Sequence, residues 1–315
     1  MTVAGELAAL AAQVGATAVV VCDHKQELMS VGDPAVTVPC RSIRKSLLGA
    51  LFGRHVIEGA LDLDATLADL GVDDCVPPPL TADERAARLR DLLTCRSGVY
   101  HPANHQPENV MLPPRGTHRP GTRFVYNNWD FNALGTILER RIGRSLFDEF
   151  ADAIARPSGM RDFDRGQQGY AAGPWSEHRT YVFRLSTRDL ARFGQLYLRK
   201  GENVIPREWV TASTHAHTRT GPGPDYGYLW WVANRGRLFA GTSVPAGSFA
   251  AYGAGSQFLL VMPALDRVVA LLADPARPGG TNRDLHRPRL ARLVHHATKG
   301  AVPLAPGPAA ESGPY

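Results

Sequence analysis

The spacing of apolar residues changes along the chain, and each change predicts a different element. The β-branched run at residues 16–23 predicts a strand, with residues 27–33 as its hairpin partner. Between residues 42 and 61, apolar residues recur at helical spacing, and the stretch SLLGALFG is apolar almost all round. We expect such a helix in the interior, where a lone lysine needs a reason.

The middle of the chain has mostly helical patterns. We predict helices over residues 81–95, 128–143, 145–157 and 186–201. A long polar segment rich in proline, glycine and histidine separates the first two. Loops of this length in compact domains usually have a function or lack order. We therefore expect residues 99–121 to set substrate preference.

The last third returns to strand patterns separated by glycine and proline turns. The runs at residues 226–233, 236–242, 248–254, 256–263 and 267–274 predict an antiparallel meander, and residues 285–300 predict a closing helix. The layout predicts an α+β fold with one antiparallel sheet from both chain ends, flanked by helices. We assign residues 1–65 and 225–300 to an α/β sheet domain, 66–224 to a helical insertion domain and 301–315 to a disordered tail.

Composition narrows the classes of function. The 315 residues carry a net charge of +5, and the arginines are scattered among acids, so we expect no nucleic-acid surface. The N-terminus lacks a signal-peptide pattern and no window predicts a membrane span, so we interpret the protein as cytoplasmic. The four cysteines form no metal motif, and no phosphate loop or dinucleotide fingerprint occurs. We expect no metal and no cofactor, and the oligomeric state stays open.

The strongest chemical signal is Ser42 followed three residues later by Lys45, one of only four lysines. A helix places these two side chains on one face, near the partial positive charge of its N-terminus. An amine can accept the serine proton if burial lowers its pKa. The alternative is a capping serine and a solvated lysine, which the apolar run after them disfavours.

Two further segments fit the same chemistry. Tyr126 and Asn128 precede a predicted helix, where the phenol could relay protons and the amide could hold Lys45 or a substrate carbonyl. A buried aromatic residue and a helix cap are the alternative. In the stretch AAYGAGSQFLLV, small residues let a substrate backbone approach a strand, and an N–H there could join that of Ser42 in an oxyanion hole. A glycine-rich hairpin turn is the alternative.

In this order, Ser42-Ile-Arg-Lys45, Tyr126-Asn-Asn128 and a glycine-rich late strand resemble the serine β-lactamase and penicillin-binding-protein superfamily. The resemblance covers residues 15–295 and is greatest to the class C β-lactamase-like branch. That branch contains D-alanyl-D-alanine carboxypeptidases, esterases and 6-aminohexanoate-dimer hydrolases. It implies a β-lactamase/transpeptidase-like fold, with Ser42 as the acylated nucleophile and Lys45 as its proton acceptor.

The resemblance also implies the other site residues. Tyr126 corresponds to the second-motif acid or base and Asn128 to its amide partner. The third motif reads Ala251-Tyr252-Gly253 in the best register, so that Ala254 would donate the second oxyanion N–H. A register shifted to Gly255 is the alternative. The family's long loop lines its cleft, so we expect substrate contacts from Tyr100 and His101. Trp230 and Trp231 lie on a predicted strand and point to opposite faces, so we expect one in the core and Trp231 at the pocket, with Tyr252 and Gly253 of the third motif.

The family's third motif begins with lysine or histidine, and Ala251 replaces that cation. The cation usually binds a substrate carboxylate, so its loss disfavours true β-lactamase or carboxypeptidase action. We expect a serine hydrolase that cleaves a small ester or amide through an acyl-enzyme on Ser42. An acyltransferase of a natural-product pathway with the same site is the alternative. A catalytically silent binding protein is a third hypothesis.

Overall fold

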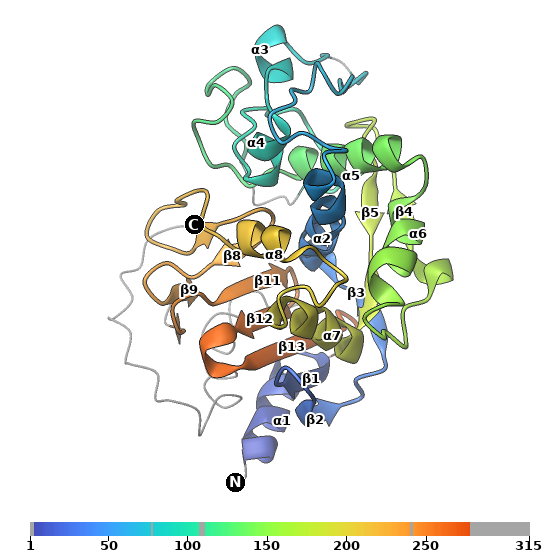
Figure 1. The fold of residues 1–315 in the computed structure, drawn as a ribbon, viewed down its shortest axis with the longest axis vertical. Helices are drawn as coiled ribbons and strands as arrows, with labels where there is room; N and C mark the ends of the chain where they lie inside the picture. Colours follow the sequence, from blue (N-terminus) through green and yellow to red (C-terminus); the bar gives the residue numbers. More distant parts are fainter. Residues whose placement is uncertain (1–2, 77, 107–110, 240–241, 278–315) are drawn as a thin grey trace.

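The computed structural model describes residues 3–76, 78–106, 111–239 and 242–277 (Figure 1). The predicted helix at 285–300 and the predicted tail at 301–315 lie outside these residues. Within the described ranges, no helix is both long and apolar enough to cross a membrane.

A seven-stranded antiparallel sheet runs in the order β2-β1-β13-β12-β11-β8-β7 (Figure 1). Its strands are β1 (Ala16–Cys22), β2 (Glu27–Gly32), β7 (Asp225–Tyr226), β8 (Trp231–Val232), β11 (Phe249–Gly253), β12 (Gln257–Met262) and β13 (Arg267–Ala273). Strand β1 pairs with β13 from Ala18 opposite Leu272 to Cys22 opposite Val268. The predicted α+β fold with one sheet from both chain ends is therefore confirmed.

The predicted meander holds for β11, β12 and β13 but is interrupted before them. Residues 226–233 do not form one strand, because Leu229 adopts a positive φ of 61° and separates β7 from β8. Strands β9 (Arg237–Phe239) and β10 (Thr242–Ser243) form a hairpin of their own outside the main sheet. Two more small ladders join β3 (Thr37–Pro39) to β6 (Arg184–Ser186) and β4 (Gly169–Ala171) to β5 (Thr180–Val182).

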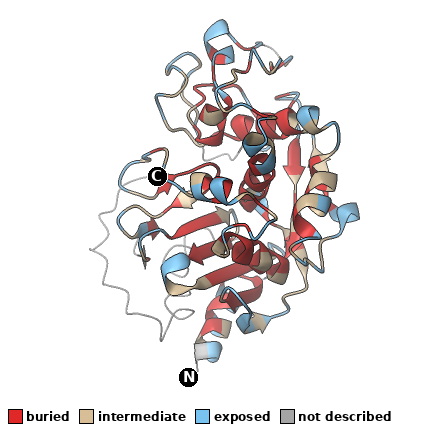
Figure 2. Ribbon diagram, viewed as in Figure 1, coloured by how far each residue is buried: buried red, intermediate tan, exposed pale blue. Residues whose placement is uncertain are grey.

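Both faces of the sheet are covered, which explains the nearly continuous apolar strands. In β13, Val268, Ala270 and Leu272 face one core, while Val269 and Leu271 face the other. Successive side chains of a strand point to opposite faces, so an apolar run with two covered faces buries every residue. Figure 2 shows the central strands buried along most of their length.

Helices lie on the sheet and form a second region beside it. They are α1 (Val3–Gln13), α2 (Arg44–Ile57), α3 (Ala82–Arg85), α4 (Leu89–Leu93), α5 (Asn128–Ile142), α6 (Leu146–Phe150), α7 (Thr187–Leu198) and α8 (Arg207–Ser213). Helix α7 packs on β13, β12 and β1, where a β-carbon on Gly194 would lie 2.5 Å from a methyl of Val268. The chain segment predicted as a helical insertion therefore supplies one helix of the sheet layer.

The segment predicted as one helix over residues 81–95 forms two short helices. Thr81 caps α3, in a capping box with Glu84. The backbone of Arg88 is extended and forms an isolated β-bridge with Thr66. This extended residue separates α3 from α4. Helix α6 continues into a π-helix over Ala151–Ala155.

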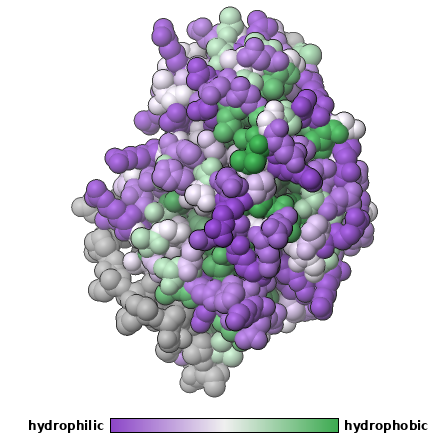
Figure 3. Space-filling view, viewed as in Figure 1, coloured by the Kyte–Doolittle hydropathy of each residue, from purple (hydrophilic) through white to green (hydrophobic). Residues whose placement is uncertain are grey.

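Hydrophilic side chains cover most of the face drawn in Figure 3, with apolar residues in separate patches.

Candidate active site

Ser42 lies in a 3-10 turn over Arg41–Ile43, directly before α2. The first ten residues of α2, which include Lys45, are all buried, and the Lys45 side chain is only 2% exposed. This burial follows from the apolar run of the helix, which packs on several sides. The turn and the helix place Ser42 and Lys45 on one side, with Nζ of Lys45 2.8 Å from Oγ of Ser42.

Tyr126 joins this pair from a segment 81 residues away. It precedes α5, and its phenol oxygen lies 2.8 Å from Nζ of Lys45. The amine also lies 4.4 Å from the ring centre of Phe131, on the first turn of α5. One buried amine thus contacts both hydroxyl groups that the sequence singled out.

Burial determines the protonation of this trio. It lowers the pKa of Lys45 well below its ordinary value, and the neighbouring charge of Arg44 lowers that pKa further. Burial also raises the pKa of the Tyr126 phenol. A neutral amine is thereby favoured as acceptor of the Ser42 proton, and a protonated phenol is favoured as a donor.

Gly253, the last residue of β11, lies against the nucleophile turn. A β-carbon at this position would lie 2.7 Å from the backbone nitrogen of Ser42 and 3.0 Å from the carbonyl oxygen of Cys40. Only glycine fits at such a distance without displacing the turn. The next residue, Ala254, is exposed and begins the turn to β12, while Gly255 lies within that turn. The contact favours the register that ends the third motif at Gly253.

Asn128 does not make the predicted hydrogen bond with Lys45. Its side-chain nitrogen donates to the carbonyl oxygen of His105 at 2.6 Å, and its Oδ1 has no hydrogen-bond partner among the described residues. Asn127 caps α5 instead, accepting from the N–H of Trp129 at 3.0 Å. The long loop before α5, rather than the lysine, fixes the Asn128 amide.

The ring of His101, which we predicted to contact substrate, is fully buried. Its nitrogens lie 2.9 Å from the carbonyl oxygen of Pro102 and 3.0 Å from that of Val76. Tyr100 is only 4% exposed, and its hydroxyl lies 2.9 Å from Nδ1 of His118. Both side chains hold the long loop against its neighbours.

The ring of Tyr126 begins a stack of three aromatic side chains. Tyr126 lies on Trp231 with ring centres 5.6 Å apart, and Trp231 lies on Tyr252 at 5.1 Å. Trp231 and Tyr252 are half-buried, whereas Trp230 is fully buried in the core. Trp230 directly precedes β8, and successive side chains of an extended chain point to opposite sides. Phe131 and Arg44 are neighbours of Lys45 that sequence reasoning missed.

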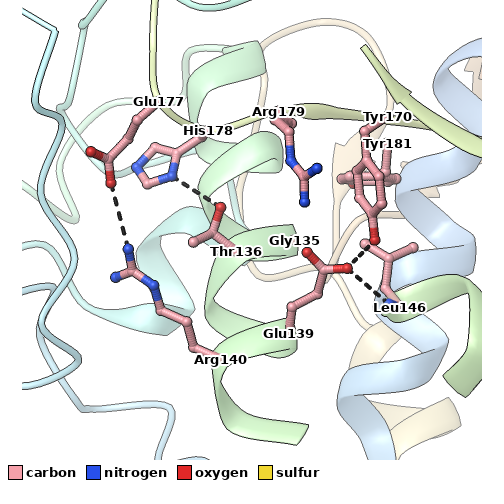
Figure 4. A pocket seen from close by; sticks show the side chains of 10 residues that line it. All are labelled: Gly135, Thr136, Glu139, Arg140, Leu146, Tyr170, Glu177, His178, Arg179 and Tyr181. Carbon is pink, nitrogen blue, oxygen red and sulfur yellow. Dashed lines mark hydrogen bonds and ion pairs between the residues drawn. The ribbon is translucent and has the colours of Figure 1, made fainter. Parts of the chain in front are cut away.

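A cavity of about 170 Å³ lies on the other side of α5, toward β4 and β5 (Figure 4). His178 contacts Thr136 there at 3.0 Å, and Arg140 pairs with Glu177 at 3.5 Å. Its lining comes from α5, α6 and residues 170–181 rather than from the Ser42 turn. Tyr181 links this region to α2, because the guanidinium of Arg44 lies 4.2 Å from its ring centre.

Comparison with known proteins fits this geometry. The beta-lactamase family model matches residues 9–293. The chain belongs to the beta-lactamase family. Its fold is β-lactamase/transpeptidase-like, and homologues with this fold are serine hydrolases.

Among curated relatives, the D-aminopeptidase of Brucella anthropi is 31% identical over 94 residues, which cover 25% of this chain and 18% of that protein. The match thus spans less than a fifth of that relative. A putative 6-aminohexanoate-dimer hydrolase from Bacillus anthracis has the same fold, with a TM-score of 0.68 and 18% identity over 92% of this chain and 82% of the other. EstCE1, described as a hydrolase with promiscuous acyltransferase activity, has a TM-score of 0.63 and 16% sequence identity. The match covers 94% of this chain and 97% of EstCE1.

Proposed function

We propose that this protein is a serine hydrolase that cleaves an ester or amide through an acyl-enzyme on Ser42. The observation that carries the proposal is the buried Lys45 amine, 2.8 Å from both the Ser42 and Tyr126 oxygens. Oγ of Ser42 attacks the substrate carbonyl carbon as Lys45 takes the hydroxyl proton. Tyr126 and Lys45 then deliver a proton to the leaving oxygen or nitrogen, and water releases the acyl group.

The oxyanion of each tetrahedral intermediate is assigned to the N–H groups of Ser42 and Ala254. The support is Gly253, which brings the end of β11 against the Ser42 nitrogen and places Ala254 next in the chain. Each such donor contributes about 3 kcal/mol to transition-state stabilisation in acyl transfer. Asn128 is assigned to the substrate side, since its Oδ1 has no hydrogen-bond partner in the described part of the chain.

The substrate class follows from what surrounds the site. Ala251 is 2% exposed and offers no cation to a substrate carboxylate. The half-buried rings of Trp231 and Tyr252 offer apolar surface beside Tyr126. We therefore assign esters or amides without a carboxylate next to the scissile bond. The similarity to D-aminopeptidases supports amides as substrates in addition to esters. Parallel assays with a nitrophenyl ester and with D-alanine nitroanilide would show whether the protein cleaves esters, amides or both.

Labelling with a fluorophosphonate probe tests the nucleophile directly. Ser42 should displace fluoride and form one covalent adduct, located by peptide mass mapping. Ser42→Ala should give no adduct, whereas Ser158→Ala should label like the wild type, because Ser158 only bonds the end of its own helix. An unlabelled wild type would contradict the proposal and favour a silent binding protein. A Ser42→Ala protein with full ester turnover would contradict the assignment of Ser42 as the nucleophile.

Acyl transfer to an amine or alcohol is the second candidate. It would use the same acyl-enzyme and differ only in the group that resolves it. The promiscuous acyltransferase activity ascribed to EstCE1, whose fold this chain shares, favours keeping this candidate. Product analysis with and without an added amine decides between water and amine as acceptor. Hydrolysed acid alone at high amine concentration would exclude the transferase.

A further inference from the structure

Arg44 is a buried cation without an acidic partner, directly before Lys45 in the chain. It is 6% exposed, and among the described residues no carboxylate forms an ion pair with it. Its Nη1 atom has no hydrogen-bond partner there either. A buried charge is normally paired, because leaving water without compensation is costly. The burial of Arg44 without a carboxylate therefore indicates that its charge has a function.

The guanidinium is nevertheless held in place from two other elements. Its Nη2 donates to Oδ1 of Asn132 on α5 at 3.2 Å. On the opposite side lies the ring of Tyr181 on β5, with its centre 4.2 Å away. Both partners are neutral, so they orient the charge without cancelling it. Figure 4 shows Tyr181 beside α5, at the edge of the cavity described above.

The groups that face Lys45 leave Arg44 as its principal charged neighbour. They are Cys40 before the nucleophile turn, Cys95 after α4, Tyr126 before α5, and, behind Cys95 and Tyr126, Tyr226 on β7 and Tyr252 on β11. Burial raises the pKa of Cys40 to about 12, and it raises the pKa values of Cys95, Tyr126 and Tyr226. Cys40, Cys95, Tyr126 and Tyr226 are therefore uncharged near neutral pH.

Asp130 is a buried carboxyl in the same region, but it faces Cys95 and Ser97. Burial raises its pKa well above the ordinary value, which favours its uncharged form. In the described part of the chain, Lys45 contacts Ser42, Tyr126 and Phe131 and has no acidic partner. A permanent positive charge nearby thus acts on the amine without opposition.

We propose that Arg44 is a positioning residue whose unpaired guanidinium helps to keep the Lys45 amine in its neutral, proton-accepting form. This inference rests on the proposed function, since it assigns Lys45 the role of base. Two like charges repel in a medium of low dielectric constant, so the charge of Arg44 disfavours protonation of Lys45. A neutral residue of similar length at position 44 would lose this effect.

The test is the pH dependence of Ser42 labelling by a fluorophosphonate, measured by intact mass. The rate should rise with pH as Lys45 loses its proton and then reach a plateau. Arg44→Met should shift the midpoint of this rise to a pH about one unit higher, as expected for loss of one nearby charge. A purely structural role would lower the plateau of Arg44→Met without moving the rise, and that result overturns the proposal.

A second variant covers the case in which Arg44→Met does not fold. Asn132→Asp places a carboxylate at hydrogen-bond distance from the guanidinium and compensates its charge while Arg44 stays in place. The rise should again move to higher pH, and an unmoved rise would contradict the inference. A wild type that labels at no pH would instead refute the proposed function, so the two failures are distinguishable.

Discussion

Gly253 and Ser42 meet backbone to backbone across the candidate active site. A β-carbon on Gly253 would lie 2.7 Å from the Ser42 nitrogen and 2.8 Å from the β-carbon of Arg41. Arg41 already has a positive φ of 52°, so the turn that carries Ser42 has little freedom to adjust. The strand end and the nucleophile turn therefore determine each other's position.

Replacing this glycine should damage catalysis more than folding. Gly253→Ala forces the Ser42 N–H or the end of β11 to move, so we expect ester turnover to fall by about a hundredfold, as for loss of one oxyanion donor. The control is Gly169→Ala in β4, where a β-carbon would meet nothing within 4 Å. Turnover of a nitrophenyl ester at matched folded concentration measures both. Unchanged turnover in Gly253→Ala would remove the third motif from the proposed site.

The Tyr126 hydroxyl provides a separate test. Tyr126→Phe keeps the ring that packs 4.9 Å from Phe131 and 5.6 Å from Trp231, but it removes the oxygen beside Lys45. We expect turnover to fall by about 10²-fold or more, as for loss of a general acid or base, with little change in melting temperature. Tyr170→Phe, which removes a hydroxyl bonded to Glu139, is the matched control and should keep its turnover. Equal activities of the two variants would exclude proton transfer by Tyr126.

The sequence predicted the parts of the site that depend on local geometry. Ser42 and Lys45 meet because they are three positions apart where a 3-10 turn runs into α2, and that spacing is visible in the sequence. The approach of Tyr126 to Lys45 depends on tertiary packing, so the sequence indicated a role for the phenol but not its distance from the amine. The strands were also predictable, because β1 and β13 carry continuous β-branched and apolar runs.

Other features depended on long-range contacts that no local pattern carries. His101 looked like a loop residue available to substrate, but the carbonyl of Val76, 25 residues away, helps to bury it. Asn128 looked like a partner for Lys45, but the carbonyl of His105 takes its amide nitrogen. Arg44 was visible inside the apolar helix and could have been singled out, because a second cation in a buried run is as unusual as the first.

Lys45 should be important for activity and unfavourable for stability. Its pKa is lowered on folding, so the unfolded chain binds the extra proton and stability is lost as pH falls below the ordinary lysine value of about 10.4. Lys45→Met should abolish detectable turnover and raise the melting temperature at pH 7, with the gain shrinking toward pH 10. The exposed Lys25→Met is the control and should change neither property. A Lys45→Met protein that melts at the wild-type temperature at every pH would show that the amine is not held neutral.

Asp130 should give stability the opposite dependence on pH. It is fully buried, one oxygen accepts from the Ser97 hydroxyl at 2.6 Å, and the other has no hydrogen-bond partner among the described residues. Because burial raises its pKa, the folded state keeps a proton that the unfolded state loses above the ordinary aspartate value of about 3.9. The Asp130 contribution is thus full below that pH and is lost as pH rises toward the folded-state pKa. Asn at this position cannot ionise, so the free energy of unfolding of Asp130→Asn relative to wild type should rise by up to about 1.4 kcal/mol per pH unit across that window. Urea unfolding at several pH values between 4 and 8 measures the difference, and a difference that stays constant with pH would mean that Asp130 ionises as readily in the folded protein as in the unfolded chain.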